Sequence, residues 1–500
     1  MNAVVERRVG LARGTRDWLQ SDYARLRGYE RALMRCFARA GYRPARTPVL
    51  EMSELHERKS GAGIVGKLFE VSGAGMAGIC LRPELTAGLV RAYVEAEEPP
   101  LLPWRAAVSG PVFRFQPTGK GVDREFIQTG VELIGAGGPA ADAEVVWLAD
   151  WSLRSLGVAA PRVRVGHVGL ILELLGGAGL PPAATSALIE SLSEAASEGK
   201  GVNTLEAALD RLTAWMGTAG ADAAAPFASP EGEPDPAVDR LFRHLVPDVT
   251  GRRSGGEIVG RLRSKWELEH SLHEVLENVR GIVRSLSALR GPAADVLARL
   301  DREFAAKAPG SVAAIAELCD MLGRLGVDPA RVELDLGFGR GVGFYTRMIF
   351  ELAVDTPDGP VEVCGGGRYD GLARVLGGLD RDDRGAGFAF GLERLDQALA
   401  ATAAPAEKPA RGWLVMGEPR RAAALAALLR DRVDIPVVTA ELEMEAAVAY
   451  AKSLGLDRIV EAGPEIEVWN LEHGDVRSVR EDELIEQIKG RLSLAGEDAR

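Results

Sequence analysis

The feature that most constrains the fold is a set of five polar blocks, four of them rich in glycine, that follow one another along the 500-residue chain. The blocks span residues 81–86, 110–135, 340–351, 364–372 and 385–395. Alternating apolar and polar residues in several of them are typical of half-buried strands, and the glycines permit tight turns and a close approach of the backbone. We therefore expect a fold that brings polar side chains from these blocks into one pocket.

Length and charge limit the remaining possibilities. A chain of 500 residues is too long for one compact core and fits two or three domains. The net charge of −12 argues against a broad basic face for nucleic acid. The cysteines are scattered without a CxxC pair, so we expect neither disulfides nor a metal site: Cys36, Cys80, Cys319 and Cys364. Without a signal-peptide pattern or an apolar run of membrane-spanning length, a cytoplasmic protein without membrane contact is expected.

Periodicity and composition divide the chain into segments of mixed helix and strand. Residues 10–165 and 331–396 contain the strand-like segments and form the expected core. Residues 170–330 are mostly helical in pattern, with a low-complexity, mobile loop near 217–236. Residues 397–411 are rich in Ala and Pro and read as a linker, and residues 412–491 alternate strand and helix like a small α/β domain.

The block at 110–135 predicts a polar face on a hairpin. Residues 112–115 and 125–133 alternate and are predicted to be strands, with Arg114 on the first. Gln128 and Glu132 lie four residues apart on the second strand, so they share a face. The three side chains suit a polar pocket, and an exposed sheet face remains the alternative.

Two glycine-rich blocks place arginines where an anion can bind. Arg340 is flanked by Gly337, Gly339, Gly341 and Gly343, and its planar fork suits a carboxylate or a phosphate. An ordinary glycine-rich hairpin is the alternative. Residues 365–370 are predicted to form a turn between a strand and a helix, which can cradle an anion, although the Gly-Lys-Ser/Thr ending of a P-loop is missing.

Together these blocks resemble the histidyl-tRNA synthetase family, a class II aminoacyl-tRNA synthetase family, from roughly residue 13 to residue 395. Pro48 resembles the proline of the dimer-forming motif, residues 113–115 the second class II motif, and residues 391–394 the third. Residues 340–345 and 365–370 resemble the two histidine signatures. The resemblance implies an α+β fold, with an antiparallel sheet flanked by helices, a helical insertion, an anticodon-binding-like C-terminal domain, and a homodimer.

The resemblance also assigns roles to individual residues. It implies a histidine-binding set on the amino-acid side of the pocket: Glu84, Thr86, Gln128, Glu132, Tyr345 and Tyr369. Arg340 and Arg114 match catalytic arginines that stabilise negative charge, and the ATP-binding positions are Arg114, Gln116 and Arg394. No metal ligand in the chain is implied.

The nucleotide side departs from the family pattern. Gln116 stands in place of a Glu, Pro117 and Val122 in place of arginines, Gly343 in place of an Asp, and Phe344 in place of a Tyr. Residues 411–500 contain 12 Lys+Arg and 18 Asp+Glu, a net charge of −6 that suits RNA poorly. A packing or dimer-stabilising domain is the alternative.

Two functions from different classes follow. The first is a histidine–tRNA ligase that uses ATP and Mg²⁺; Arg340 and the C-terminal domain put it narrowly ahead. The second is a non-catalytic, histidine-binding paralogue, which resembles the regulatory subunit of ATP phosphoribosyltransferase and would bind that enzyme's catalytic subunit; the departures favour it. A free-standing histidine-activating enzyme without tRNA is a third possibility.

Overall fold

The computed structural model describes residues 10–60, 66–73, 76–116, 123–178, 272–337, 344–401, 412–432, 435–480 and 483–484. The chain folds as two compact units, Met1–Ala403 and Ala404–Arg500. Of the described helices, none is long and apolar enough to cross a membrane. The expected mobile loop near 217–236 lies outside the described residues.

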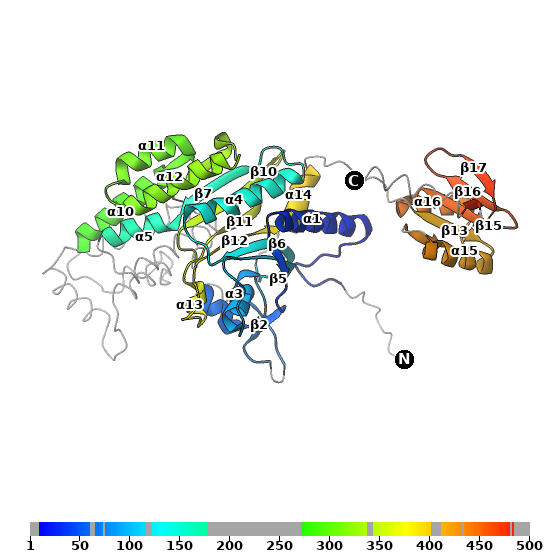
Figure 1. Ribbon diagram of the computed structural model, residues 1–500, viewed down its shortest axis with the longest axis horizontal. Helices are drawn as coiled ribbons and strands as arrows, with labels where there is room; N and C mark the ends of the chain where they lie inside the picture. Colours follow the sequence, from blue (N-terminus) through cyan, green and yellow to red (C-terminus); the bar gives the residue numbers. More distant parts are fainter. Residues whose placement is uncertain are drawn as a thin grey trace, which may run out of the picture. The chain divides into compact units, whose positions relative to one another are not determined.

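A mixed, mainly antiparallel sheet forms the centre of the first unit (Figure 1). In the part of the chain that the structure describes, nine strands belong to it, in the order β1-β5-β6-β12-β11-β10-β7-β9-β8. Their bounds are β1 Arg43–Ala45, β5 Trp104–Phe113, β6 Glu125–Ile134, β7 Arg162–His167, β8 Arg290–Pro292, β9 Val332–Asp335, β10 Met348–Thr356, β11 Gly359–Arg368 and β12 Gly385–Gly391. The pairs β1·β5 and β7·β9 are parallel, and the other neighbouring pairs are antiparallel. This architecture confirms the predicted fold class.

Helices cover both faces of the sheet. In Figure 1, α1 (Gln20–Arg39), α4 (Gly138–Ser155) and α14 (Leu392–Ala401) lie along one face. The opposite side carries α2 (Ser53–Ser60), α3 (Thr86–Glu95), α13 (Leu372–Val375) and a small sheet of β2 (Leu50–Met52), β3 (Phe69–Glu70) and β4 (Ile79–Leu81). The candidate site lies on this second side.

Alternation along β6 decides which side chains face the site. Val131 and Leu133 are fully buried in the core cluster that includes α1 and α4. Because successive strand residues point to opposite faces, Glu132 points to the other side, as Gln128 does four residues earlier. On that side α3 packs through Leu89 against the sheet at Val108. The hairpin sequence therefore separates an apolar face from a polar one.

The predicted strand at 112–115 was misplaced. The structure has a longer strand, β5, which ends at Phe113, so Arg114 follows the strand. The residues from Ala106 to Val108 are all buried, because helices cover both faces, and a strand buried on both faces shows no alternation in sequence. The backbone N–H of Arg114 still donates to the carbonyl oxygen of Arg124 at 2.8 Å, which extends the hairpin.

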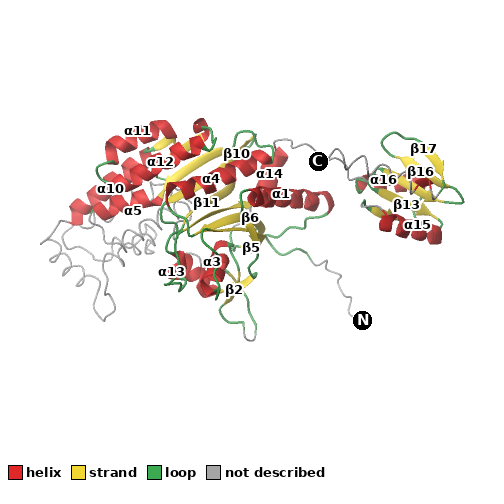
Figure 2. Cartoon of the chain, in the orientation of Figure 1, coloured by secondary structure: helices red, strands yellow, loops and turns green. Residues whose placement is uncertain are grey.

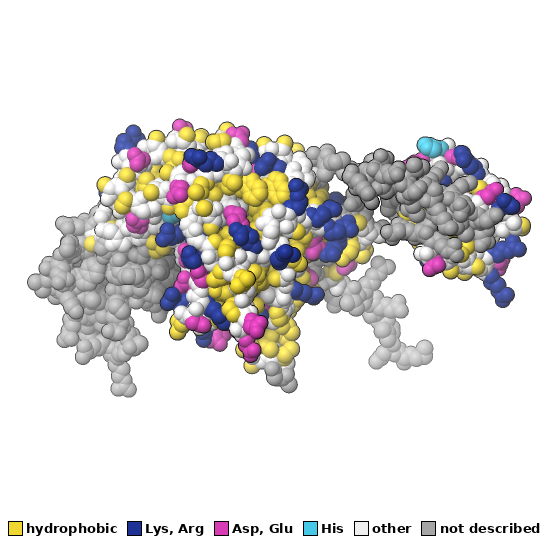
Figure 3. All heavy atoms as spheres, viewed as in Figure 1, with side chains coloured by type: hydrophobic (Ala, Val, Ile, Leu, Met, Phe, Trp, Pro, Cys, Tyr) yellow, Lys and Arg dark blue, Asp and Glu magenta, His cyan; other side chains and the backbone are white. Residues whose placement is uncertain are grey.

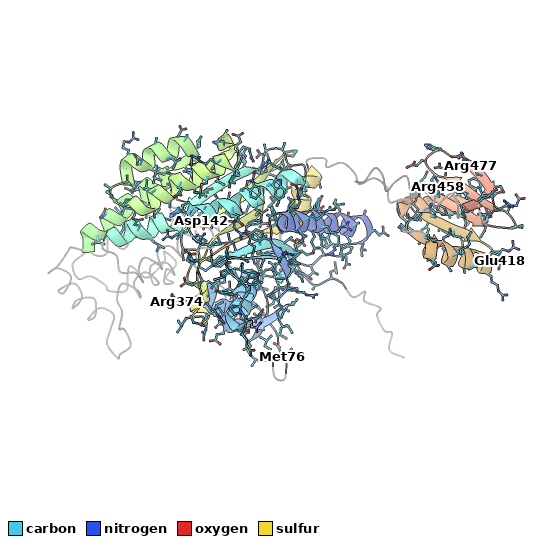
Figure 4. The ribbon with its side chains drawn as sticks, viewed as in Figure 1. Met76, Asp142, Arg374, Glu418, Arg458 and Arg477 are labelled. Carbon is cyan, nitrogen blue, oxygen red and sulfur yellow. The ribbon has the colours of Figure 1, made fainter. Side chains whose placement is uncertain are left out.

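The predicted anion-binding turn at 365–370 was also wrong. Residues 365–368 belong to β11, and Gly366 and Gly367 pair with neighbouring strands on both sides. A Cβ on Gly366 would lie 2.2 Å from the carbonyl oxygen of Gly387, so glycine is needed for close strand packing here. Arg368 is fully buried and donates to Asp142 (labelled in Figure 4) and to Asp370, so its charge is compensated inside the protein.

The described part of the expected helical insertion packs on the core. It contains α5 (Val168–Gly177), α10 (Leu272–Ala288), α11 (Ala293–Phe304) and α12 (Pro309–Arg324), and β8 adds to the edge of the core sheet. The expected linker at 397–411 starts too early, because α14 continues to Ala401. Ala398 and Leu399 are buried in the main core, which keeps this Ala-rich stretch helical.

The second unit is a small α/β domain (Figure 2). Among its described residues, a five-stranded sheet has the order β14-β13-β15-β16-β17. The elements are β13 Trp413–Gly417, α15 Pro419–Arg432, β14 Val437–Thr439, α16 Met444–Ser453, β15 Arg458–Ala462, β16 Ile466–Asn470 and β17 Val476–Val479. Val415 and Leu414 are buried in separate apolar clusters, one with α15 and one with α16, so the two helices cover opposite faces of the sheet.

Candidate functional site

A buried carboxyl group lies at the centre of the site. Glu132 is 3 % exposed, and its two oxygens accept hydrogen bonds from the Thr86 hydroxyl and the Tyr369 hydroxyl, each at 2.5 Å. Burial raises the pKa of Glu132 to about 7 although both hydrogen bonds favour the charged form. Burial and the neighbouring Glu132 raise the pKa of Tyr369 well above its ordinary value, so the phenol remains a donor. The cluster joins α3, β6 and the segment after β11.

Two glycines of β12 make room for this cluster. A Cβ on Gly387 would lie 1.9 Å from Oε2 of Glu132, and a Cβ on Gly385 would lie 2.2 Å from the Tyr369 ring. Gly387 is the direct partner of Glu132 in the β12·β6 register. No other residue fits at these two positions without moving the carboxyl group or the ring. The glycines of the block at 385–395 thus leave room for the carboxyl group and the ring, whereas the sequence alone indicated only a strand of small residues.

Glu84 is held by neighbours on all sides. It accepts hydrogen bonds from the backbone N–H groups of Thr86 at 2.7 Å and Ala87 at 3.0 Å, which caps the start of α3. The ammonium group of Lys59 lies 2.9 Å from Oε2, and Nδ1 of His56 lies 3.6 Å from Oε1. Burial alone would raise the pKa of Glu84, but Lys59 and His56 hold it well below its ordinary value.

Lys59 and His56 were not identified from the sequence. Lys59 belongs to the charged run Glu57-Arg58-Lys59, which reads as the solvated face of a short helix. In the structure its side chain is 2 % exposed and its ammonium lies 3.9 Å from the centroid of the Phe344 ring. Nothing local in the sequence distinguishes Lys59 from exposed Arg58, since only the tertiary contact with Glu84 buries it.

Tyr345 and Gln128 complete the predicted histidine-binding set. Tyr345 packs against Phe344, with ring centroids 4.2 Å apart, and belongs to the apolar surroundings of Tyr369. A Cβ on Gly367 would lie 2.9 Å from the Tyr345 ring, so a glycine at this position leaves room for the ring. Gln128 is partly buried on the face of β6 that carries Glu132. The structure therefore brings together pocket residues from four distant blocks, those at 81–86, 110–135, 340–351 and 364–372.

The predicted ATP-binding side chains all have protein partners. Arg114 donates from Nε to the carbonyl oxygen of Pro83 at 2.8 Å and lies over the Phe126 ring. Gln116 donates to the carbonyl oxygen of Asp123 at 2.8 Å, which closes the base of the hairpin loop. Arg394 is half exposed at the start of α14 and lies 3.8 Å from a carboxylate oxygen of Glu362.

Several residues of the nucleotide side are outside the described part of the chain. Arg340, Pro117, Val122 and Gly343 all fall in the gaps at 117–122 and 338–343. The predicted catalytic role of Arg340 therefore stays a prediction, as do the other residue roles.

Comparison with known proteins identifies the family. The family model described as histidyl-tRNA synthetase matches residues 14–229 and 239–395. A histidine–tRNA ligase of Methanosarcina acetivorans is 29 % identical over 97 % of this chain and 99 % of its own length. An ATP phosphoribosyltransferase regulatory subunit of Moorella thermoacetica is 32 % identical over 84 % of this chain and 88 % of its own.

The fold agrees with solved structures. The crystal structure of histidyl-tRNA synthetase from Nostoc sp. PCC 7120 superposes with a TM-score of 0.64, covering 97 % of this chain and all of that one, at 15 % sequence identity. At that identity the likeness concerns the fold alone. The extent of the family match, together with the relative at 32 % identity, shows that this chain belongs to the histidyl-tRNA synthetase family.

Proposed function

We propose that this chain binds free histidine at the Glu132 cluster and acts as the histidine-sensing regulatory subunit of an ATP phosphoribosyltransferase. One observation carries the proposal: a buried carboxyl group, Glu132, is held by the hydroxyls of Thr86 and Tyr369 on the amino-acid side, while Arg114, Gln116 and Arg394, predicted to bind ATP, each have a protein partner. The name of the Moorella relative supports the same function, and the family also contains ligases.

The chemistry of Glu132 suits a histidine side chain. With its pKa near 7, the carboxyl group is close to the ordinary imidazole value of about 6.5. When charged, it accepts a hydrogen bond from a ring N–H, and the Tyr369 and Thr86 hydroxyls hold its two oxygens in place. Tyr345 and Phe344 supply an apolar wall beside the cluster. Recognition of an imidazole therefore needs no movement of the carboxyl group.

The nucleotide side is weaker as a phosphate site. Pro117 and Val122 stand where the family pattern has arginines, and each lost charge-assisted hydrogen bond is worth about 1.5–3 kcal/mol. Arg394 shares its charge with Glu362, a carboxylate that would also repel a triphosphate. The loss of two arginines and the carboxylate beside a third favour a protein that binds histidine without adenylating it.

The second candidate is the histidine–tRNA ligase that the sequence placed narrowly ahead. Arg340 in the sequence and the match to the Methanosarcina ligase over 99 % of its length favour it. This activity requires ATP, Mg²⁺ and tRNA. Among the described residues, no group of three or more His, Cys, Asp or Glu side chains is arranged to hold a metal ion. In Figure 3, the visible described side chains of the second unit include both Lys or Arg and Asp or Glu.

Histidine-dependent exchange of pyrophosphate with ATP separates the two candidates. With the pure full-length chain, we expect calorimetry to detect histidine binding and the exchange assay to stay at background. Addition of the chain to the catalytic subunit of an ATP phosphoribosyltransferase from the same source should make that enzyme sensitive to histidine. Exchange above background would overturn the regulatory proposal, and charging of the cognate tRNA would then distinguish the ligase from a free-standing activating enzyme.

A further inference from the structure

The position of Lys59 has a consequence for what the pocket recognises. Glu84 is one of the residues that the family pattern assigns to the histidine-binding set, where a carboxylate suits the α-ammonium of an amino acid. In this chain an ammonium is already present there, on the side chain of Lys59, 2.9 Å from Oε2 of Glu84. Its other neighbour is the face of the Phe344 ring, 3.9 Å away. A carboxylate and an aromatic face together are a typical site for a desolvated ammonium.

Glu84 has little accepting capacity left. A carboxylate offers about four lone-pair positions. Three are used by the N–H groups of Thr86 and Ala87 and by the Lys59 ammonium, and His56 lies against the remaining side. Lys59 also compensates the charge of Glu84, since the two groups form a direct ion pair within the protein. A second cation would gain little at this carboxylate while Lys59 remains in place.

Glu132 differs from Glu84 in this respect. It receives one hydroxyl hydrogen bond on each oxygen, from Thr86 and Tyr369, and each oxygen keeps a further lone pair. The two described hydrogen-bond partners of Glu132 are neutral hydroxyls, and Lys59 acts on it only through its charge, without a described ion pair. Of the two carboxyl groups, Glu132 therefore keeps the larger capacity to accept hydrogen bonds.

We infer that Lys59 is a specificity-determining residue, which takes the place of the ligand's α-ammonium on Glu84 and leaves Glu132 to select the imidazole. The inference rests on the proposed binding of histidine at this site. It means that the pocket discriminates little between histidine and deamino-histidine, the imidazole propionate that lacks the α-ammonium. A family pocket with a free Glu84 would instead require that ammonium.

Paired ligands and paired variants test the inference. The affinities of L-histidine and deamino-histidine are measured by calorimetry on the full chain with Lys59, with Lys59→Met and with Lys59→Ser. Arg58→Met is the matched control, because Arg58 is an exposed cation one position earlier on α2 that forms an ion pair with Glu54. Circular dichroism and thermal unfolding of each variant, with and without ligand, report whether it folds.

The expected result is a change in preference. The wild-type chain and Arg58→Met should bind the two ligands within about threefold of each other. Removal of Lys59 leaves Glu84 without its counter-charge. The ratio of the affinity for histidine to the affinity for deamino-histidine should therefore be at least about tenfold higher in both Lys59 variants than in wild type. A tenfold change is the effect expected from one charge-assisted hydrogen bond. Histidine should also stabilise the Lys59 variants more than it stabilises the wild type.

Failure of the inference and failure of the proposed function look different. If the wild type binds histidine but the ligand preference is the same with and without Lys59, or if the folded variants lose affinity for both ligands equally, Lys59 only supports the structure and the inference is overturned. If the wild type binds neither ligand, the proposed function fails. In that case histidine binding gained by Lys59→Met would still support the inference, and its absence would overturn that as well.

Discussion

The replacement Glu132→Gln tests the raised pKa at the centre of the site. The pKa of Glu132 is about 7 in the folded chain and 4.5 in an ordinary glutamate, because burial disfavours the charged carboxylate. Between these two values the folded state holds a proton that the unfolded state has released. The free energy of unfolding contributed by Glu132 therefore falls as the pH rises from about 4.5 to about 7. A shift of this size corresponds to about 3 kcal/mol.

Glutamine keeps the shape and the acceptor oxygen but does not titrate. We expect wild type to lose about 2.5 kcal/mol of stability relative to Glu132→Gln between pH 5 and pH 8, measured by urea unfolding followed by tryptophan fluorescence. Burial also raises the pKa of Glu393 to about 7 and that of Asp142 to about 6, and both groups are present in both proteins, so the difference isolates Glu132. A difference in stability that stays constant over this pH range would refute the reasoning.

The remaining predictions concern the glycine beside the carboxyl group and the buried arginine. Gly387→Ala places a Cβ 1.9 Å from a carboxyl oxygen of Glu132. We expect this variant to lose histidine binding in calorimetry and to be destabilised by about 1–3 kcal/mol. Gly391→Ala, whose Cβ would have open space around it, should change neither histidine binding nor stability. Arg368→Met leaves Asp142 buried without its counter-charge and should reduce the free energy of unfolding by about 3–5 kcal/mol in urea, whereas Arg374→Met, on the exposed side of α13, should change it by less than about 1 kcal/mol. A loss that is equal in the two arginine variants would contradict this assignment of the buried pair.

The strands nearest the site show which parts of the sheet a sequence pattern can predict and which it cannot. Residues 125–133 alternate because one face of β6 meets the helical core and the other meets the polar site, and the predicted strand matches the observed one closely. The first half of β5 carries no such signal, because Ala106 to Val108 are buried on both sides. The glycines at 365–367 are typical of a turn in sequence, because the sequence does not show that neighbouring strands leave no room for a Cβ.

The ordered polar blocks were enough to show the resemblance to the histidyl-tRNA synthetase family, and this resemblance implied the fold class and a shared site for Glu84, Thr86, Glu132 and Tyr369. It depends on residue types at fixed positions, which the sequence contains directly. Tertiary structure decided the charge state of the group. Burial raises the pKa of Glu132, and Lys59, 25 positions before Glu84, compensates the other carboxylate. Desolvation and ion pairing depend on distances between remote segments, so they follow only once the chain has folded.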